Sequence, residues 1–268
     1  MTPRQPTLFI PHGGGPCFFM PNPPDHPHLW DGMAAYLRGI AASLPERPRA
    51  ILIVSGHWEA PQVTVNRAAQ PGMLFDYYGF PAHTYQLRYP APGSPALAGR
   101  IVSLLSEAGM PSAAEDRRGY DHGVFVPLLL MFPEADIPVV QVSLLAGLDP
   151  AAHLAMGHAL APLRDEGVLI VGSGMSYHNM HAFMANAHVP DIPSRQFDQW
   201  LADALADPAR RARDLVRWAV APGGRQSHPR EEHLLPLMVA AGAAGTDAGR
   251  HTFQGTIWGK TVSGFQFG

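Results

Sequence analysis

The run Ala50–Ser55 reads Ala-Ile-Leu-Ile-Val-Ser and is apolar at five successive positions. A strand with apolar side chains on both faces must be covered on both faces, as the inner strands of parallel or mixed sheets are. Similar short runs recur along the chain, at Thr7–Ile10, Pro138–Leu144 and Val168–Val171. These four runs predict a central sheet that is buried on both sides.

Segments with helical spacing of apolar residues alternate with these strands. Helices are expected over Trp30–Leu44, Ala96–Ala108, Val124–Met131, Pro150–Glu166, Ser194–Ala206, Pro208–Val220 and Arg230–Ala241. The segment Thr252–Phe267 alternates in the manner of edge strands. The interleaving predicts an α/β fold with a central, mostly parallel or mixed sheet flanked by helices on both faces. Because the 268 residues contain no repeat and no low-complexity linker, we expect one domain spanning residues 1–268.

Charge and cysteine content exclude several classes of protein. The net charge is −3, and Lys260 is the single lysine among 19 basic residues, so no basic stripe for nucleic acid is expected. No apolar run approaches the ~20 residues of a membrane span, and no secretory leader is evident. Cys17 has no second cysteine to pair with, which favours a reducing compartment, and we expect a cytoplasmic protein. Charged residues make up only 15%, which hints at a homo-oligomer.

Three of the 14 histidines follow predicted strands. His12 lies two residues past the first strand, His57 follows Ala50–Ser55, and His178 lies in the loop after Val168–Val171. In open α/β sheets, ligands bind beyond the carboxyl ends of the strands. Histidine is a common metal ligand and the usual proton carrier near neutral pH. The pattern therefore predicts a metal or acid–base site at this edge of the sheet.

Two further histidines sit at expected helix starts. His122 follows Asp121, which we expect to be the N-cap of the helix, and it would face the site. His233 lies where a cation would oppose the helix dipole, whereas a neutral, metal-bound imidazole would not. The remaining histidines are expected in surface loops or on exposed helix faces: His26, His28, His83, His153, His158, His181, His188, His228 and His251.

Other known site motifs do not fit the sequence. It has no His-Glu-x-x-His, no Cys-x-x-Cys, no phosphate loop and no Gly-x-Gly-x-x-Gly after a strand. Gly172-Ser173-Gly174 lacks the full Gly-x-Ser-x-Gly of a nucleophile elbow, so a serine hydrolase is weakly supported.

As a set, these segments resemble the class III extradiol ring-cleaving dioxygenases, the superfamily of the protocatechuate 4,5-dioxygenase beta subunit. The 4,5-DOPA dioxygenase branch is the most similar. The resemblance is carried, in order along nearly the whole chain, by Pro11-His12-Gly13, Ser55-Gly56-His57-Trp58, Tyr78-Gly79-Phe80-Pro81, Tyr89-Pro90-Ala91-Pro92-Gly93, Asp121-His122-Gly123, Gly172-Ser173-Gly174, His178-Asn179 and Glu232-His233 before Leu235-Pro236-Leu237.

The resemblance implies a non-haem Fe²⁺ enzyme that inserts both atoms of O₂ into a catechol and cleaves the ring beside its hydroxyls. His12 and His57 match metal ligands of the family, and His233 matches the third ligand of the DOPA-type branch. His178 matches the acid–base histidine, and His122 matches a pocket histidine near substrate or O₂.

The sequence departs from the family pattern in its first loop. That loop reads His-Gly-Gly-Gly-Pro where the branch commonly has His-Gly-Ser-Pro. Other branches use a glutamate as third ligand, and Glu232 adjoins His233, so an exchange of ligand stays open.

The expected site suits this chemistry. A three-ligand face leaves positions for a bidentate catecholate and O₂, and no organic cofactor is needed. An all-histidine face would also bind Zn²⁺ as purified, since Zn²⁺ outcompetes Fe²⁺ at equal availability. An apolar lining for the substrate ring is expected from Trp58, Tyr78, Phe80 and Phe125.

Two alternatives stay open at this point. One is a Zn²⁺ hydrolase with a His₃-bound water, for which Glu59 or Glu232 would have to face the metal as general base. The other is a non-catalytic relative of the same fold. The substrate is also open among DOPA, caffeate, protocatechuate-like acids and larger catechols. The candidates for binding a substrate carboxylate are Arg88, Arg117 and Arg225.

Overall fold

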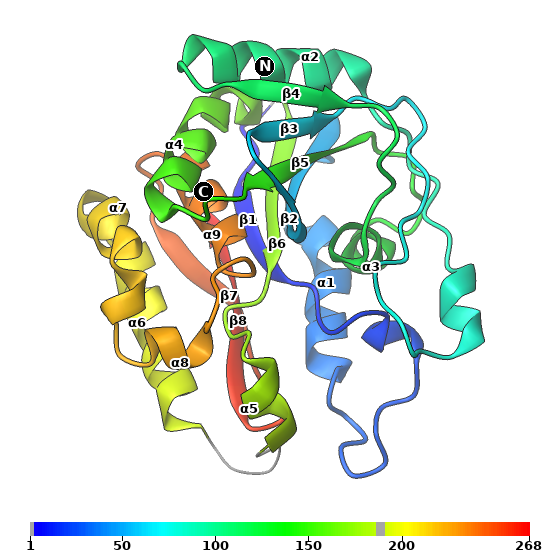
Figure 1. Ribbon diagram of the computed structural model, residues 1–268, viewed down its shortest axis with the longest axis vertical. Helices are drawn as coiled ribbons and strands as arrows, with labels where there is room; N and C mark the ends of the chain where they lie inside the picture. The colour runs from blue at the N-terminus through cyan, green and yellow to red at the C-terminus, as the bar shows by residue number, and fades with distance from the viewer. Residues whose placement is uncertain (1–2, 186–190) are drawn as a thin grey trace.

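The sheet is the centre of the computed structural model, which describes residues 3–185 and 191–268 (Figure 1). Its strands are β1 (Thr7–Pro11), β2 (Ala50–Ala60), β3 (Val63–Asn66), β4 (Ser112–Glu115), β5 (Val139–Leu145), β6 (Val168–Gly174), β7 (Gly249–Ile257) and β8 (Lys260–Phe267). All eight belong to one sheet in the order β4-β3-β5-β2-β6-β1-β8-β7.

The middle of the sheet is parallel. Parallel pairs join β5 to β2, β2 to β6 and β6 to β1, so the carboxyl ends of these four strands lie at one edge. The two outer parts contain the antiparallel pairs, β3 with β5 on one side and β1–β8–β7 on the other. The predicted mixed α/β sheet is confirmed.

Helices cover both faces of the sheet. They are α1 (Asp31–Ser43), α2 (Pro95–Glu107), α3 (His122–Met131), α4 (Pro150–Leu160), α5 (Met180–Ala185), α6 (Ile192–Ala206), α7 (Pro208–Val216), α8 (Gly224–Ser227) and α9 (Leu235–Ala243). One core lies between the sheet and α1 and α3; the other joins α2, α4, α6 and α9 to the opposite face. No helix in the described ranges has the length and hydropathy of a membrane span.

The inner strand β2 explains this double cover. Ile51 and Ile53 pack into the core beneath α1 and α3, whereas Leu52 and Val54 pack into the core on the opposite face. All four side chains are fully buried. An apolar residue at every position therefore serves both cores, as expected for a strand covered on both sides.

Several predicted boundaries were wrong. The last predicted helix starts at Leu235 rather than Arg230, because Pro236 is tolerated only in the first turn of a helix. The helix from Pro150 ends at Leu160 and continues as a short 3₁₀ segment. The segment Pro208–Val220 likewise divides, since α7 ends at Val216.

Some short elements carried too weak a signal to be predicted. These are β3, β4, α5 and α8. Of the two strands in the C-terminal hairpin, only β7 is an edge strand, because β8 pairs with β1.

Two histidines that we expected on the surface are fully buried. His153 accepts a hydrogen bond from the Leu145 N–H at 3.0 Å and donates to the Asp149 carbonyl at 2.7 Å. His228 donates from Nε2 to the Ser176 carbonyl at 2.9 Å. Both are structural residues of the core. The prediction for His188 lies outside the described residues.

The turn of the β7–β8 hairpin has an unusual composition. Ile257 pairs with Lys260, and the two residues between them, Trp258 and Gly259, have φ values of 45° and 76°. Positive φ at both central positions is the signature of a type I′ turn, which favours Asn-Gly. A bulky residue in this region costs roughly 1–3 kcal/mol, so Trp258 is held there by other contacts.

Burial of neutral His228 makes stability depend on pH. Burial lowers the pKa of His228 to about 3. In the unfolded chain, His228 has a pKa of ~6.5. Below that pH the unfolded chain binds more protons than the folded chain. The contribution of neutral His228 to the free energy of unfolding is therefore complete above pH ~6.5 and is lost as the pH falls.

We therefore expect His228 to account for about 2 kcal/mol of lost unfolding free energy between pH 7 and pH 5. Urea unfolding of the wild type and of His228→Gln at both pH values measures this difference. An equal loss in the two proteins would contradict the assignment.

Candidate metal centre

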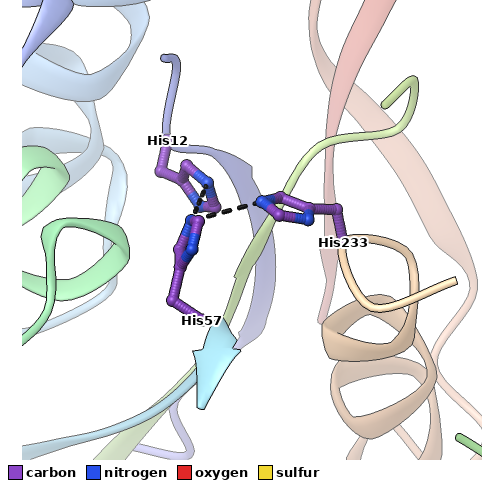
Figure 2. Close-up of side chains that lie close together, drawn as sticks. All are labelled: His12, His57 and His233. Carbon is purple, nitrogen blue, oxygen red and sulfur yellow. Dashed lines mark hydrogen bonds between the residues drawn. The ribbon is translucent and has the colours of Figure 1, made fainter. Parts of the chain in front are cut away.

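Three histidines from distant parts of the chain meet at the carboxyl edge of the parallel strands. His12 directly follows β1, His57 lies on β2, and His233 lies two residues before α9. The Nε2 atom of His57 is 3.1 Å from Nε2 of His12 and 3.2 Å from Nε2 of His233. Figure 2 shows the three imidazole rings pointing toward one another. The strand order makes this meeting possible, since β2, β6 and β1 are neighbours.

An irregularity in β2 directs His57 toward this centre. The pairing of β2 with β5 shifts register between Val54 and Glu59, and His57 lies within the shifted stretch. Such irregularities bend a strand and re-aim its side chains, and they are common beside active sites.

Glycines hold the segment that carries His233. A Cβ at Gly174 would lie 2.1 Å from the carbonyl oxygen of His233, and one at Gly56 would lie 3.3 Å from its Cα. The Met175 N–H donates to that same carbonyl at 3.0 Å. The backbone before α9 is therefore held closely between β2 and β6. The motif Gly172-Ser173-Gly174 serves this close packing rather than a nucleophile elbow.

Ser173 fixes the tautomer of His12. Its hydroxyl donates to the Gly123 carbonyl, so toward His12 Nδ1, at 3.1 Å, it can only accept. The Nδ1 atom of His12 must then carry the hydrogen, and Nε2 presents a lone pair to the centre.

Carboxylates orient the other two histidines. Nδ1 of His233 lies 3.1 Å from Oε1 of Glu232, so it donates, and Nε2 again presents a lone pair. Nδ1 of His57 lies 3.7 Å from Oδ2 of Asp76. Metal-binding histidines commonly donate their second ring nitrogen to a carboxylate or hydroxyl in this way.

The three histidines are neutral at physiological pH. Burial, and then repulsion from neighbouring histidines, lowers the pKa of His12 and of His57 well below the usual value. Burial, and then repulsion by His178, lowers the pKa of His233 to about 4 despite the opposing Glu232 carboxylate. Neutral imidazoles are the form that binds metals.

The donor set fits a divalent cation. His12 and His233 both present lone pairs toward His57, which has one Nε2 and can donate to only one of them. At least one buried lone pair therefore lacks a hydrogen to accept, which is costly in a buried site. The His12–His57–His233 ligand atoms all lie within 4.8 Å of one another, and a cation between them would satisfy every lone pair.

His178 and His122 flank this centre. The His178 ring stacks on His233, with ring centroids 3.5 Å apart, and its Nδ1 lies 3.2 Å from Oε1 of Glu232. His122 opens α3, and its ring centroid is 3.9 Å from that of His57. All five histidines singled out in the sequence thus lie together.

Asp76 is the residue that the sequence did not reveal. One carboxylate oxygen accepts from the His122 backbone N–H at 3.0 Å and from its Nδ1 at 2.7 Å. Asp76 therefore takes the capping bond that we had expected from Asp121. The Asp121 side chain makes no cap bond and instead accepts from Ser55 at 2.8 Å and Arg118 at 3.1 Å. Asp76 lies in a loop far from any strand motif, so only the folded structure shows its role.

Two overlapping groups could also hold a metal ion: His57–Asp76–His122 and His178–Glu232–His233. In each of them the carboxylate faces the Nδ1 atoms of its histidines. Hydrogen bonding between carboxylate and imidazole accounts for both arrangements. Glu232 therefore lies behind His233 as its hydrogen-bond partner.

An apolar cavity of about 380 Å³ opens in front of the histidines. Of the lining residues expected from the sequence, Phe80 is confirmed. Trp58 is instead buried with Arg118 stacked on its ring, Phe125 lies in the core, and Tyr78 is 90% exposed. The cavity is lined by His12, Gly13, Gly14, Gly15, Cys17, Met20, Pro21, Pro23, Trp30, His57, Phe80, His122, Met175, His178, Met180, Phe183, His233, Ile257 and Trp258.

The fold and the site define an α/β protein with a histidine centre, able to hold a metal ion, at the carboxyl edge of its sheet. The family model of the catalytic LigB subunit of aromatic ring-opening dioxygenase matches residues 6–265, and the chain belongs to this family. The predicted membership of the class III extradiol dioxygenase superfamily is confirmed.

Curated relatives and a solved structure agree with this assignment. The chain is 45% identical to the 4,5-DOPA dioxygenase extradiol of Beta vulgaris over 204 residues, 76% of each chain. It is 38% identical to dioxygenase tasH of Hapsidospora irregularis, over 89% of this chain and 78% of that one. The crystal structure of the uncharacterized protein JW3007 from Escherichia coli K12 is 32% identical and superimposes with a TM-score of 0.78, covering 99% of this chain and 100% of that one.

The close approach at Gly174 gives a test of the centre. We expect Gly174→Ala to displace His233 and weaken Zn²⁺ binding by about 10- to 100-fold or more, as loss of ligand support does. Titration against a competing chelator measures the affinity. Gly39→Ala is the matched control, because a Cβ there meets no atom within 4 Å. Equal affinity in a folded Gly174→Ala protein would contradict this account of how His233 is positioned.

Proposed function

We propose that this protein is an Fe²⁺-dependent extradiol dioxygenase that cleaves a catechol ring with incorporation of both atoms of O₂. The observation that carries the proposal is the trio of neutral imidazoles whose Nε2 atoms face one another in the lining of an apolar cavity. The dioxygenase names of the family and of its relatives support it.

His12, His57 and His233 would hold the metal. Three protein ligands on one side leave positions open for a bidentate catecholate and for O₂. When bound, Fe²⁺ supplies the Lewis acidity that lowers the pKa of the catechol hydroxyls and the redox path from substrate to oxygen. No organic cofactor is required.

His178 is the proposed acid–base residue. Its Nδ1 faces the Glu232 carboxylate, so it carries the hydrogen and leaves Nε2 free to accept a proton from a catechol hydroxyl. Glu232 would then stabilise the resulting imidazolium. Despite burial, hydrogen bonds from His178 and His233 hold the pKa of Glu232 well below its usual value, and its other carboxylate oxygen accepts from Arg230 at 3.3 Å.

His122 is the proposed pocket histidine. Asp76 accepts from its Nδ1, which leaves Nε2 as the second free imidazole nitrogen of the cavity. We assign it to orienting the substrate or O₂ by hydrogen bonding.

The zinc hydrolase alternative requires a carboxylate free to act as general base. Glu59 is held by Arg230 in a bidentate pair at 2.6 and 2.7 Å. Glu232 is engaged by His178, His233 and Arg230. Because both carboxylates are held in these interactions, neither is free to act as a general base, which is evidence against the zinc hydrolase. The arrangement of five histidines around one cavity is evidence against the other alternative, a non-catalytic relative of the same fold.

The cytoplasmic location and the homo-oligomeric state stay predictions.

Metal removal and anaerobic reconstitution with Fe²⁺, followed by O₂ addition to a panel of catechols, tests the proposed activity. We expect stoichiometric O₂ uptake together with a yellow ring-opened product. No uptake with any catechol, at one bound iron per chain, would refute the proposal.

The acid–base assignment has its own test. His178→Gln is expected to lower kcat by about 10²- to 10⁴-fold, the usual contribution of a positioned proton carrier, while metal stoichiometry stays unchanged. His158→Gln, on an exposed helix face, is the control and should retain full activity. Loss of bound metal in His178→Gln would make His178 a ligand instead.

The all-histidine face predicts the metal found after purification. Zn²⁺ binds such ligands more tightly than Fe²⁺ at equal availability. We expect protein purified without added iron to carry Zn²⁺ and to gain activity only after exchange for Fe²⁺. Elemental analysis that finds iron alone would contradict this prediction.

A further inference from the structure

Three aromatic side chains form one wall of the cavity. Trp258 meets Trp30 edge to face with ring centroids 5.6 Å apart, and it meets Phe183 in the same manner at 5.8 Å. Trp30 and Phe183 are buried, whereas Trp258 is half-buried, and all three line the cavity. We call this group the aromatic wall. Its members come from three separate places in the chain: the start of α1, α5, and the β7–β8 turn.

The backbone of Trp258 points to a role beyond packing. The φ of 45° at this position is unfavourable for a bulky side chain, and the type I′ turn would be relaxed by asparagine or glycine. Residues held in such conformations gather at ligand-binding sites, where the side chain is needed in that place. Here the conformation places an indole at the cavity.

The arginines that were candidates for binding a substrate carboxylate do not line the cavity. Arg225 pairs with Glu231 at 2.8 Å and lies over the Trp218 ring at 4.5 Å. Arg88 donates to the carbonyl of Leu87. Together with Arg117, these arginines were our candidates for binding a substrate carboxylate, and none of the three is among the described residues that line the cavity.

The cavity is also larger than one catechol ring requires. Its volume of about 380 Å³ lies within the ~300–1,000 Å³ of sites that bind drug-sized molecules. With the ring at the histidines, a ring substituent would occupy the remaining space between the aromatic wall and the nearby side chains of Met20 and Met180. No arginine or lysine is among the described residues that line the cavity, so a carboxylate in that space would lose hydration without gaining an ion pair, which is costly.

On the basis of the dioxygenase function proposed above, we propose that the substrate is a catechol with an uncharged, apolar substituent, and that Trp258 is the residue that selects it. Amino-acid and carboxylated catechols are then the poorer substrates. The selection lies in the aromatic wall, and the chemistry at the histidines is common to both classes.

A matched pair of catechols tests this selection. Dihydrocaffeate and 4-(3-methylbutyl)catechol have side chains of equal length that branch at the same carbon, one ending in a carboxylate and the other in two methyl groups. We expect kcat/KM of the Fe²⁺-loaded enzyme to favour the apolar member by at least ~10-fold, as hydrophobic pockets discriminate. Calorimetric titration of the Zn²⁺-loaded protein without O₂ should give the same order of Kd.

Trp258→Asn separates selection from packing. Asparagine suits the turn, so we expect the thermal midpoint to stay equal or rise, while the preference for the apolar catechol falls about 10-fold, mainly through KM. A variant that binds the two catechols with the wild-type ratio would overturn the role of Trp258.

A charge introduced at the cavity provides a second variant that does not depend on the turn. Met180 lines the cavity and is 53% exposed, whereas Met184, on the same short helix, is 83% exposed and is not among the lining residues. We expect Met180→Arg to improve kcat/KM for dihydrocaffeate about 10-fold or more and Met184→Arg to leave it unchanged. An equal response of the two variants would overturn the proposed location of the substituent.

The two proposals fail in different ways. If iron-loaded wild type consumes O₂ with dihydrocaffeate or L-DOPA as efficiently as with the apolar catechol, the selectivity is refuted and the dioxygenase function stands. If no catechol causes O₂ uptake while the order of Kd values holds, the function is refuted and the apolar specificity of the cavity stands.

Discussion

The rest of the structure depends on one constraint, which is that imidazole nitrogens carrying lone pairs face one another in a buried site. Lone pairs that face one another repel, and burial prevents the rings from relieving this by taking up protons. The surrounding structure must therefore hold the rings in position against that repulsion. It does so through the hydrogen bonds that Nδ1 of His12 donates to Ser173 and Nδ1 of His233 donates to Glu232, and through backbone packed too closely to shift.

Two carboxylates organise the site in parallel ways. Asp76 faces both His57 and His122, and Glu232 faces both His233 and His178. Each carboxylate thus joins one proposed metal ligand to one proposed reactive histidine. A change in the charge on either ring would therefore alter the interaction of the shared carboxylate with the other ring. This pairing gives a role to two acids that are not among the residues lining the cavity.

Much of this arrangement follows from sequence, and the remainder has identifiable causes. The buried strands were recognisable because Ala50–Ser55 is apolar on both faces, and the histidines because they follow such strands. Asp76 could not be found in this way, since its role depends on a loop folding against α3. His228 was predicted to lie on the surface but is buried, because nothing in its polar segment of sequence indicates that other parts of the chain pack over it. Most of the residues that line the cavity were not predicted, because they come from turns and loops, where the periodicity of the sequence carries no information.

The strand order has a consequence for synthesis of the protein. The first strand, β1, lies between β6 and β8, and the third histidine of the centre follows both β1 and β6 in sequence. A chain emerging from the ribosome presents His12 and His57 long before His233 or the neighbours of β1 exist. The early part of a nascent chain therefore has neither a completed sheet nor a completed site, and a metal ion could not be bound by all three histidines until translation has passed His233.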